Sequence, residues 1–188
     1  MFNFGKELRE TEQFPVEIVE NVKITKAFFV RGERFGEALD IIYQCEKEGT
    51  LFEHRQRIFA VDKDRVPTWS SYDKEINKLK QTLFHILSRF YTFEELKFEA
   101  DSFESMSVKI IEFLEEGPIM NEDLFSLKFI FNRSFEYPEI PSNGRFMKTD
   151  KDLFTLGYTE WEKENRLLKD ESEENNDSDN SNTSGYTL

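Results

Sequence analysis

The chain has 188 residues, with 38 acidic against 25 basic side chains and a formal net charge of −13. This length fits one domain with tails or two small domains, and the single Cys45 excludes an intrachain disulfide. No apolar run approaches the roughly 20 residues that cross a bilayer, and the first residues lack the pattern of a signal peptide, so we expect a cytoplasmic protein without membrane contact.

The first half of the chain predicts a small sheet. Residues 1–21 are polar and are expected to form an N-terminal arm. Three segments rich in β-branched and aromatic residues follow, over 22–30, 38–45 and 51–60, and short glycine-containing turns separate them. Such short connections cannot cross over a sheet, so we predict an antiparallel meander.

Residues 71–117 predict a helical segment. The apolar residues of 72–90 recur at steps of three and four, which is typical of an amphipathic helix, here opened by Ser70 or Ser71. Capping-box spacings indicate a short second helix near residue 92 and a third helix that stops at Gly117.

The sequence then returns to strand patterns. Residues 124–131 are apolar at nearly every position and predict a fourth strand, followed by a turn at 132–134. A fifth strand is interrupted by Pro138 and Pro141. Residues 150–168 are mixed in character and include aromatic side chains that could pack back onto the domain.

This order of elements predicts an α+β, mainly β fold over residues 22–168. Three meander strands, a helical insertion at 71–117 and two more strands are the order of an OB-fold, a five-stranded Greek-key barrel. Another arrangement of helices on an antiparallel sheet would give a similar order. From Asp170 onward there are six acids and no base, so residues 169–188 are predicted to be a disordered acidic tail.

Strand parity predicts a nucleic-acid-binding face. Residues 22–67 hold nine bases and eight acids, a net of +1, so this part of the chain is close to neutral although the whole chain is acidic. Alternate positions place bases and aromatic rings on the outer face and in the flanking turns, which suits phosphates and unstacked bases of a single strand. The candidate residues are Lys23, Phe29, Arg31, Arg34, Phe35, Arg55, Arg57, Phe59, Lys128, Arg133, Phe135 and Tyr137.

The same parity assigns an inner face, and two alternatives stay open. The predicted inward side chains are Ile24, Phe28, Leu39, Ile41, Tyr43, Ile58, Phe129 and Phe131. An error of one position would exchange the two faces. Interleaved Phe and Arg also describe an ordinary core with a solvated rim.

Three segments resemble the single-stranded DNA-binding proteins of tailed bacteriophages. They are residues 22–29, residues 127–132 leading into Pro138 and Pro141, and the tail from Asp170. The resemblance implies an OB-fold, sequence-independent binding of single-stranded DNA in replication or recombination, a location in the bacterial host cytoplasm, and a tail that competes with DNA or recruits replication partners. The chain ends in Gly185-Tyr186-Thr187-Leu188, which Asn and Ser separate from the acids.

Two other classes of function remain as alternatives. A net charge of −13 also suits an acidic interaction module, such as an inhibitor or immunity-type protein that blocks a basic partner. An enzyme is not expected, because the chain has no P-loop, HExxH or Gly-x-Ser-x-Gly motif. With two histidines and one cysteine, we expect no zinc site and no cofactor.

Overall fold

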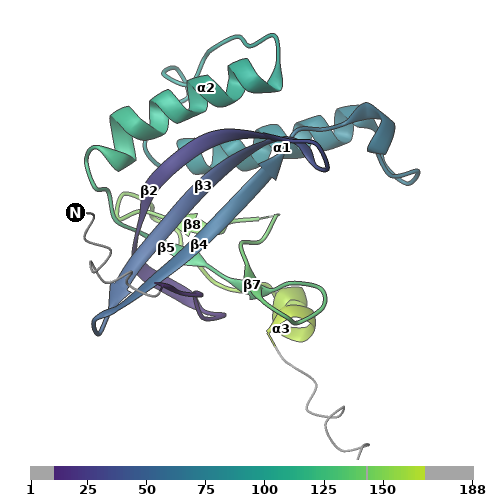
Figure 1. Ribbon diagram of the computed structural model, residues 1–188. Coiled ribbons are helices and arrows are strands. Elements are labelled where there is room, and N and C mark those ends of the chain that lie inside the picture. The colour runs from purple at the N-terminus through teal and green to yellow at the C-terminus, as the bar shows by residue number, and fades with distance from the viewer. Residues whose placement is uncertain (1–10, 143, 168–188) are drawn as a thin grey trace, which may run out of the picture.

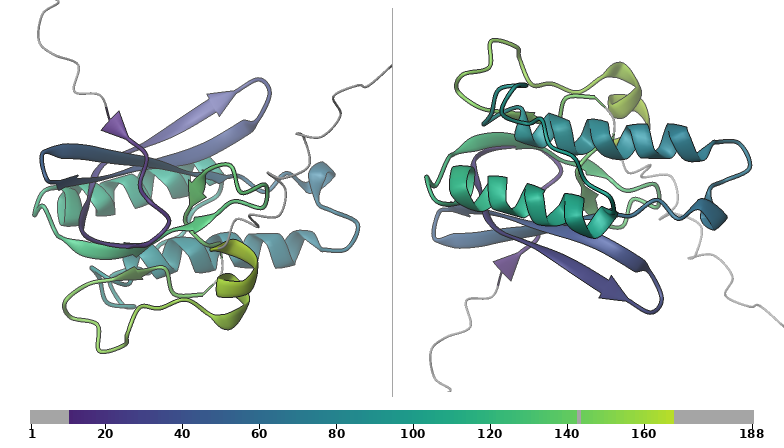
Figure 2. Two further views of the ribbon diagram at one scale, coloured as in Figure 1. Left: turned by 90° about the horizontal axis from the view of Figure 1, so that it is seen from below. Right: turned by 90° about the horizontal axis from the view of Figure 1, so that it is seen from above.

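The computed structural model describes residues 11–142 and 144–167. The strands of its main sheet are, in spatial order, β1 (Thr11–Glu12), β4 (Thr50–Phe59), β3 (Gly36–Lys47), β2 (Ile18–Gly32), β5 (Phe125–Lys128) and β8 (Met147–Lys148). A small hairpin of β6 (Ile130–Phe131) and β7 (Pro138–Glu139) forms a second sheet. Two helices lie on the same side of the main sheet, and a third, short helix packs near the hairpin (Figures 1 and 2). The tail at 169–188 and the first ten residues of the arm lie outside the described residues.

The predicted meander is confirmed, and its first two strands are longer than expected. It consists of β2 (Ile18–Gly32), β3 (Gly36–Lys47) and β4 (Thr50–Phe59), each antiparallel to the next. The β3–β4 connection is a two-residue loop in which Glu48 and Gly49 both have positive φ, 53° and 82°. Positive φ at both central positions is the geometry of hairpin turns whose twist matches that of the flanking strands.

A β-bulge in β2 changes which side chains face the core. Ile24 pairs with Tyr43, but Lys26 already pairs with Ile42, so Thr25 is the extra residue. An extra residue reverses the parity of everything that follows it. The predicted faces of three residues are therefore wrong. Phe29 and Arg31 lie on the core side, opposite Leu39 and Glu37. Phe28 lies on the outer side, opposite Asp40.

The helical segment is confirmed in two of its three parts. Helix α1 (Tyr72–Leu87) begins at Ser71, whose side chain accepts a hydrogen bond from the Lys74 amide. Helix α2 (Phe103–Leu114) begins with a capping box at Ser102 and continues into a π-helical turn over Glu115–Ile119. The short helix expected near residue 92 is a hydrogen-bonded turn instead.

The last strands are shorter than predicted, and the sheet does not close into a barrel. The predicted fourth strand is divided into β5 (Phe125–Lys128) and β6 (Ile130–Phe131), and the fifth into β7 (Pro138–Glu139) and β8 (Met147–Lys148). β5 pairs with β2, and β8 pairs only with β5. The edge of β4 therefore has no strand partner beyond β1 (Thr11–Glu12) within the described residues.

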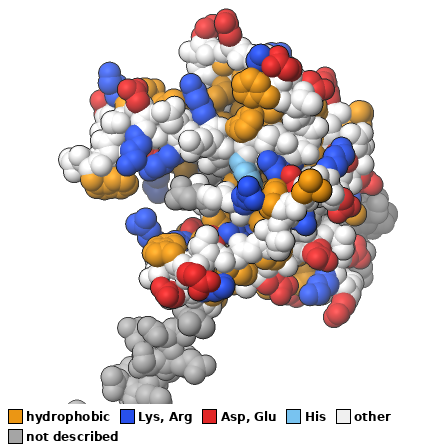
Figure 3. Space-filling model, turned by 180° about the vertical axis from the view of Figure 1, so that it is seen from behind, with side chains coloured by type: hydrophobic (Ala, Val, Ile, Leu, Met, Phe, Trp, Pro, Cys, Tyr) orange, Lys and Arg blue, Asp and Glu red, His pale blue; other side chains and the backbone are white. Residues whose placement is uncertain are grey.

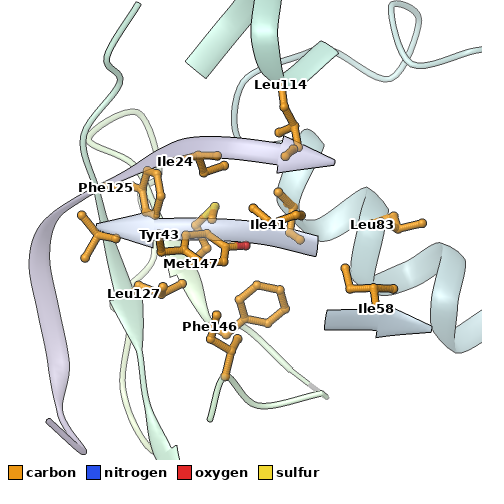
Figure 4. Packing of buried hydrophobic residues seen from close by; sticks show 14 of the residues in the cluster. Ile24, Ile41, Tyr43, Ile58, Leu83, Leu114, Phe125, Leu127, Phe146 and Met147 are labelled. Carbon is orange, nitrogen blue, oxygen red and sulfur yellow. The ribbon is translucent and has the colours of Figure 1, made fainter. Parts of the chain in front are cut away.

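The core lies between the curved sheet and the two long helices. Ile24, Ile41 and Tyr43 come from the sheet, and Leu83 and Leu114 come from α1 and α2 (Figure 4). Burial of such side chains stabilises the fold by about 1.5–3 kcal/mol each. The Tyr43 hydroxyl donates a 2.7 Å hydrogen bond to the Gln56 side chain, and burial raises the pKa of Tyr43 far above its ordinary value.

Residues 11–21 belong to the domain and do not form a free arm. Thr11 and Glu12 pair in parallel with Leu51 and Phe52 of β4. Phe14 is 2% exposed, and its ring stacks on Phe129 with centroids 4.7 Å apart. The polar composition of this segment hid the buried ring that anchors it.

The C-terminal segment covers the outer side of β5. Helix α3 (Glu160–Arg166) has a capping box at Thr159, and its Glu162 reaches Lys128. Lys128 is 2% exposed, and its ammonium lies 2.9 Å from both carboxylate oxygens of Glu162. The prediction of Lys128 as a surface base is therefore wrong, because residues 157–162 cover it.

Among the described residues, no helix is long and apolar enough to cross a membrane.

Candidate nucleic-acid interface

The outer face of the meander carries interleaved cations and rings. The β3–β4 register places Arg55, Arg57 and Phe59 on this face, opposite Ile42, Asp40 and Ala38. After the bulge, β2 adds Lys26 and Phe28, and the Lys26 ammonium lies 5.1 Å from the centroid of the Phe28 ring. Lys26 and Phe28 are members of this face that strand parity alone missed.

A buried carboxylate organises the arginines of this face. Asp40 is fully buried, and each of its carboxylate oxygens accepts a 2.7 Å hydrogen bond from Arg57. Arg55 lies farther away, at 3.9 Å, and its side chain is 56% exposed. The hydrogen bond to Asp40 raises the pKa of Arg57, so the guanidinium is a fixed positive group.

The turn between β2 and β3 folds an aromatic ring back onto this surface. A side chain at Gly32 would place its Cβ only 2.3 Å from Cε1 of Phe35, so only glycine leaves room for this ring. The rings of Phe35 and Phe59 have centroids 6.2 Å apart and meet edge to face at 69°. The Arg57 guanidinium lies 4.7 Å from the Phe35 centroid, within the range of a cation–π contact.

A shallow pocket of about 450 Å³ continues from this ring pair. Its walls include Phe35, Phe59, Arg34 and Arg65, with Pro67 beyond them. Two acids also line it, but each already holds a cation: Asp62 pairs with Arg65 at 3.2 Å and Glu75 with Lys78 at 2.9 Å. The pocket therefore combines flat apolar walls with bases at its rim.

Trp69 is a further aromatic side chain near this pocket and was not among the predicted site residues. It is 72% exposed and follows the pocket residues Val66 and Pro67 along the chain. The Lys78 ammonium lies 5.5 Å from its ring centroid. The sequence did contain a signal for it: a tryptophan in a polar loop, after Pro67 and before Ser70 and Ser71, has no apolar neighbours to pack with and is therefore expected to be exposed.

Two predicted site residues on β2 lie away from this surface. Phe29 packs against Phe103 of α2, with centroids 6.4 Å apart. Arg31 pairs with Glu37 at 2.5 Å and with Glu104 of α2 at 2.9 Å. Both lie on the helix-covered side of the sheet, because the bulge at Thr25 reverses the parity of the residues that follow it.

The remaining predicted residues are dispersed. Lys23 is on the outer side but pairs with Glu122 at 3.1 Å. Arg133, Phe135 and Tyr137 belong to the β6–β7 hairpin, which Figure 1 shows well apart from the β2–β3 turn. Arg133 and Tyr137 are exposed there, whereas the Phe135 ring packs on Phe131.

The two histidines are partly buried, neutral groups and do not belong to the interface. His54 points to the inner side of β4, where its ring meets Phe129 at 5.1 Å, and burial lowers its pKa to about 4. His85 on α1 accepts a 3.4 Å hydrogen bond from the Phe146 amide, and burial lowers its pKa to about 4 as well. Within the described part of the chain, no three His, Cys, Asp or Glu side chains gather as metal ligands would.

No known protein family matches this chain, and neither a curated protein nor a solved structure is significantly similar to it.

Proposed function

We propose that this protein binds single-stranded DNA without sequence preference. The observation that carries the proposal is the exposed Phe35–Phe59 ring pair beside Arg34, Arg57 and Arg65 at the open end of β4. Rings of this kind stack on bases of any identity, and arginines at their rim contact phosphates. The refined binding surface therefore consists of the outer face of β2, β3 and β4 with the β2–β3 turn.

The strand order is compatible with an open OB-type fold. The hairpin-connected strands β2, β3 and β4 are joined by β5, which returns through the helical insertion to lie beside β2. This is a Greek-key order, and the OB-fold is a partly open Greek-key barrel. OB-folds bind ligands on the face of their second and third strands and on the loop between the first and second, which here correspond to β3, β4 and the turn with Phe35.

A role in replication or recombination, as in the phage proteins that the sequence resembles, is part of this proposal. Within it, the tail of residues 169–188, which carries six acids from Asp170 onward, competes with DNA for the basic face. A tethered segment has a high effective concentration, and salt screens both its charge and that of DNA. DNA binding is accordingly expected to be strongest at low salt.

The test is fluorescence anisotropy of a labelled oligo-dT of about 20 nucleotides with the full chain at low salt. Each stacked base is worth about 1–3 kcal/mol, so Phe35→Ala with Phe59→Ala is expected to weaken binding at least tenfold. Both rings are partly exposed, at 36% and 50%, so their loss removes little core. The matched control is Phe84→Ala with Phe93→Ala, another exposed pair that is expected to leave DNA affinity unchanged.

Absence of salt-sensitive oligo-dT binding by the full chain would refute the function. Equal binding by the double variant and the original chain would refute this site.

A further inference from the structure

The helical layer contains an apolar groove that the proposed function does not use. A pocket of about 380 Å³ opens between α1, α2 and the connection that joins them. Its apolar walls are Leu83, Phe84, Leu96, Phe98, Met106 and Ile110. A cavity of this size accommodates one or two large side chains of a partner.

An exposed aromatic pair forms the lip of this groove. The rings of Phe84 and Phe93 have centroids 6.1 Å apart, and the residues are 45% and 63% exposed. In the view from behind, hydrophobic side chains are exposed in the upper part of the molecule, and acidic side chains lie along its upper edge (Figure 3). Apolar surface of this kind beside a groove is typical of a site where another molecule binds.

The connection that borders the groove is strongly acidic. Residues 92–104 contain five acids and one base, a net of −4. Two of these acids hold cations already, Glu94 on Lys97 at 2.7 Å and Glu104 on Arg31 at 2.9 Å. Glu95 accepts hydrogen bonds from Thr92, and Glu99 and Asp101 are exposed.

The opposite wall adds one base, Lys80 of α1. Leu96 and Phe98 point into the pocket, and Glu99 beside them is exposed. An apolar floor under a mostly negative border is therefore the chemistry that an occupant must match.

This charge excludes two occupants that the chain itself could supply. The tail ends in Tyr186-Thr187-Leu188, but it carries six acids and would be repelled by the border of the groove. A second copy of the chain, at a net charge of −13, would be repelled as well. Positive charge is what complements this border.

We propose that the groove binds a short amphipathic segment of a basic partner protein. Large apolar side chains of that segment enter between α1 and α2, and its Lys or Arg side chains lie against Glu95, Glu99 and Asp101. This is recognition of an amphipathic helix by a groove, with charge selecting the partner. The proposal does not depend on DNA binding, because the groove is on the helical side and the Phe35–Phe59 pair is on the outer face of the sheet.

The experiment uses the full chain and a labelled amphipathic peptide of leucine and lysine, with a leucine and glutamate peptide of the same pattern as the charge control. We expect the lysine peptide to bind and the glutamate peptide not to bind. In methyl NMR spectra, the signals of Leu83, Leu96, Met106 and Ile110 are expected to shift, while those of Leu39 and Ile58 in the sheet stay in place.

Substitutions locate the site. Phe84→Ser with Phe93→Ser is expected to weaken peptide binding at least about tenfold, as loss of central aromatic contacts does at interfaces. The matched control, Phe35→Ser with Phe59→Ser, is expected to keep full peptide affinity. Glu99→Gln with Asp101→Asn is expected to weaken binding several-fold and to reduce its dependence on salt.

Four results would overturn the proposal. The first three are equal binding of the two peptides, methyl shifts outside the groove, and unchanged affinity in the Phe84→Ser, Phe93→Ser variant. The fourth concerns the Tyr186→Ser, Leu188→Ser variant without peptide: if its groove methyl signals shift, the groove is occupied by the chain's own tail.

Discussion

Two pairs of exposed phenylalanines in this protein have almost the same geometry and different electrostatic surroundings. Phe35 and Phe59 meet at 6.2 Å and 69° on the sheet, and Phe84 and Phe93 meet at 6.1 Å and 73° on the helical layer. Each pair also has a cation over one ring, at 4.7 Å for Arg57 and 5.3 Å for Lys97.

The surrounding charge distinguishes the pairs. Around the sheet pair, Arg34, Arg57 and Arg65 line or border an open pocket, and Arg57 and Arg65 are paired with Asp40 and Asp62, so that acids and bases balance there. Around the helix pair, the border of the groove is acidic by a net of −4 over residues 92–104. Exposed rings alone therefore predict only that something binds, and the charge beside them indicates whether a nucleic acid or a basic protein fits.

The largest expected effect is a difference in stability loss between substitutions of the two cations that lie over the rings, Arg57 and Lys97. Arg57→Ala removes both hydrogen bonds to the fully buried Asp40 and leaves it only the 3.9 Å contact with the half-exposed Arg55. Breaking a buried pair in this way costs about 3–5 kcal/mol. Lys97→Ala removes only an exposed pair with Glu94, worth at most about 1 kcal/mol. Urea denaturation measures both, and equal losses would show that Arg57 is an ordinary surface cation.

Conservative replacement refines that result. Arg57→Lys is expected to restore only part of the stability, because an ammonium lacks the planar pair of nitrogens with which Arg57 binds the two oxygens of Asp40.

Acid is expected to weaken the two regions through their buried histidines. Burial lowers the pKa of His54 and of His85 from the ordinary 6.5 to about 4, so between these values the unfolded chain binds more protons. Stability is thus complete above about pH 6.5 and falls as the pH drops toward 4, by about 2 kcal/mol for His54 at about pH 5. His85, which is less buried, is expected to contribute less.

Urea denaturation at neutral pH and at about pH 5 tests this dependence. His54→Gln is expected to flatten the larger part of it and His85→Gln the smaller part. Stability that stays constant over this range would contradict the burial of both rings.

The smallest expected effect concerns Trp69, which extends the sheet surface. The chain contains two tryptophans, so Trp161→Phe leaves Trp69 as the only indole. Because bases stack on exposed rings, we expect oligo-dT to quench its emission partially, and Trp69→Phe to leave Trp161 unquenched. Quenching of Trp161 alone would place the DNA on the C-terminal side instead.

Elements that local sequence patterns specify could be predicted from the sequence. The meander follows from short turns, and α1 follows from its apolar period and the cap at Ser71. The bulge at Thr25 was not predictable, because nothing in the alternation around Ile24 marks an extra residue. That one residue moved Phe29 and Arg31 away from the proposed surface and brought Phe28 to it.

Long-range packing accounts for the other errors. Lys128 has the parity of an outer residue, but Glu162, 34 positions later, covers it and binds its ammonium. Burial raises the pKa of Glu162, but the hydrogen bonds from Lys128 and Thr159 outweigh it, so the net pKa is lowered. That the sheet stays open was also not predictable, because it depends on where β8 pairs: it joins β5 at the edge of the sheet away from β4.

A crossed binding experiment with both aromatic pairs and both ligands tests most directly whether each pair has its own partner. We expect Phe35→Ala with Phe59→Ala to lose oligo-dT and keep the leucine and lysine peptide, and Phe84→Ala with Phe93→Ala to do the reverse. Loss of both ligands by either variant, or of neither by both, would contradict the claim that charge assigns each ring pair its own partner.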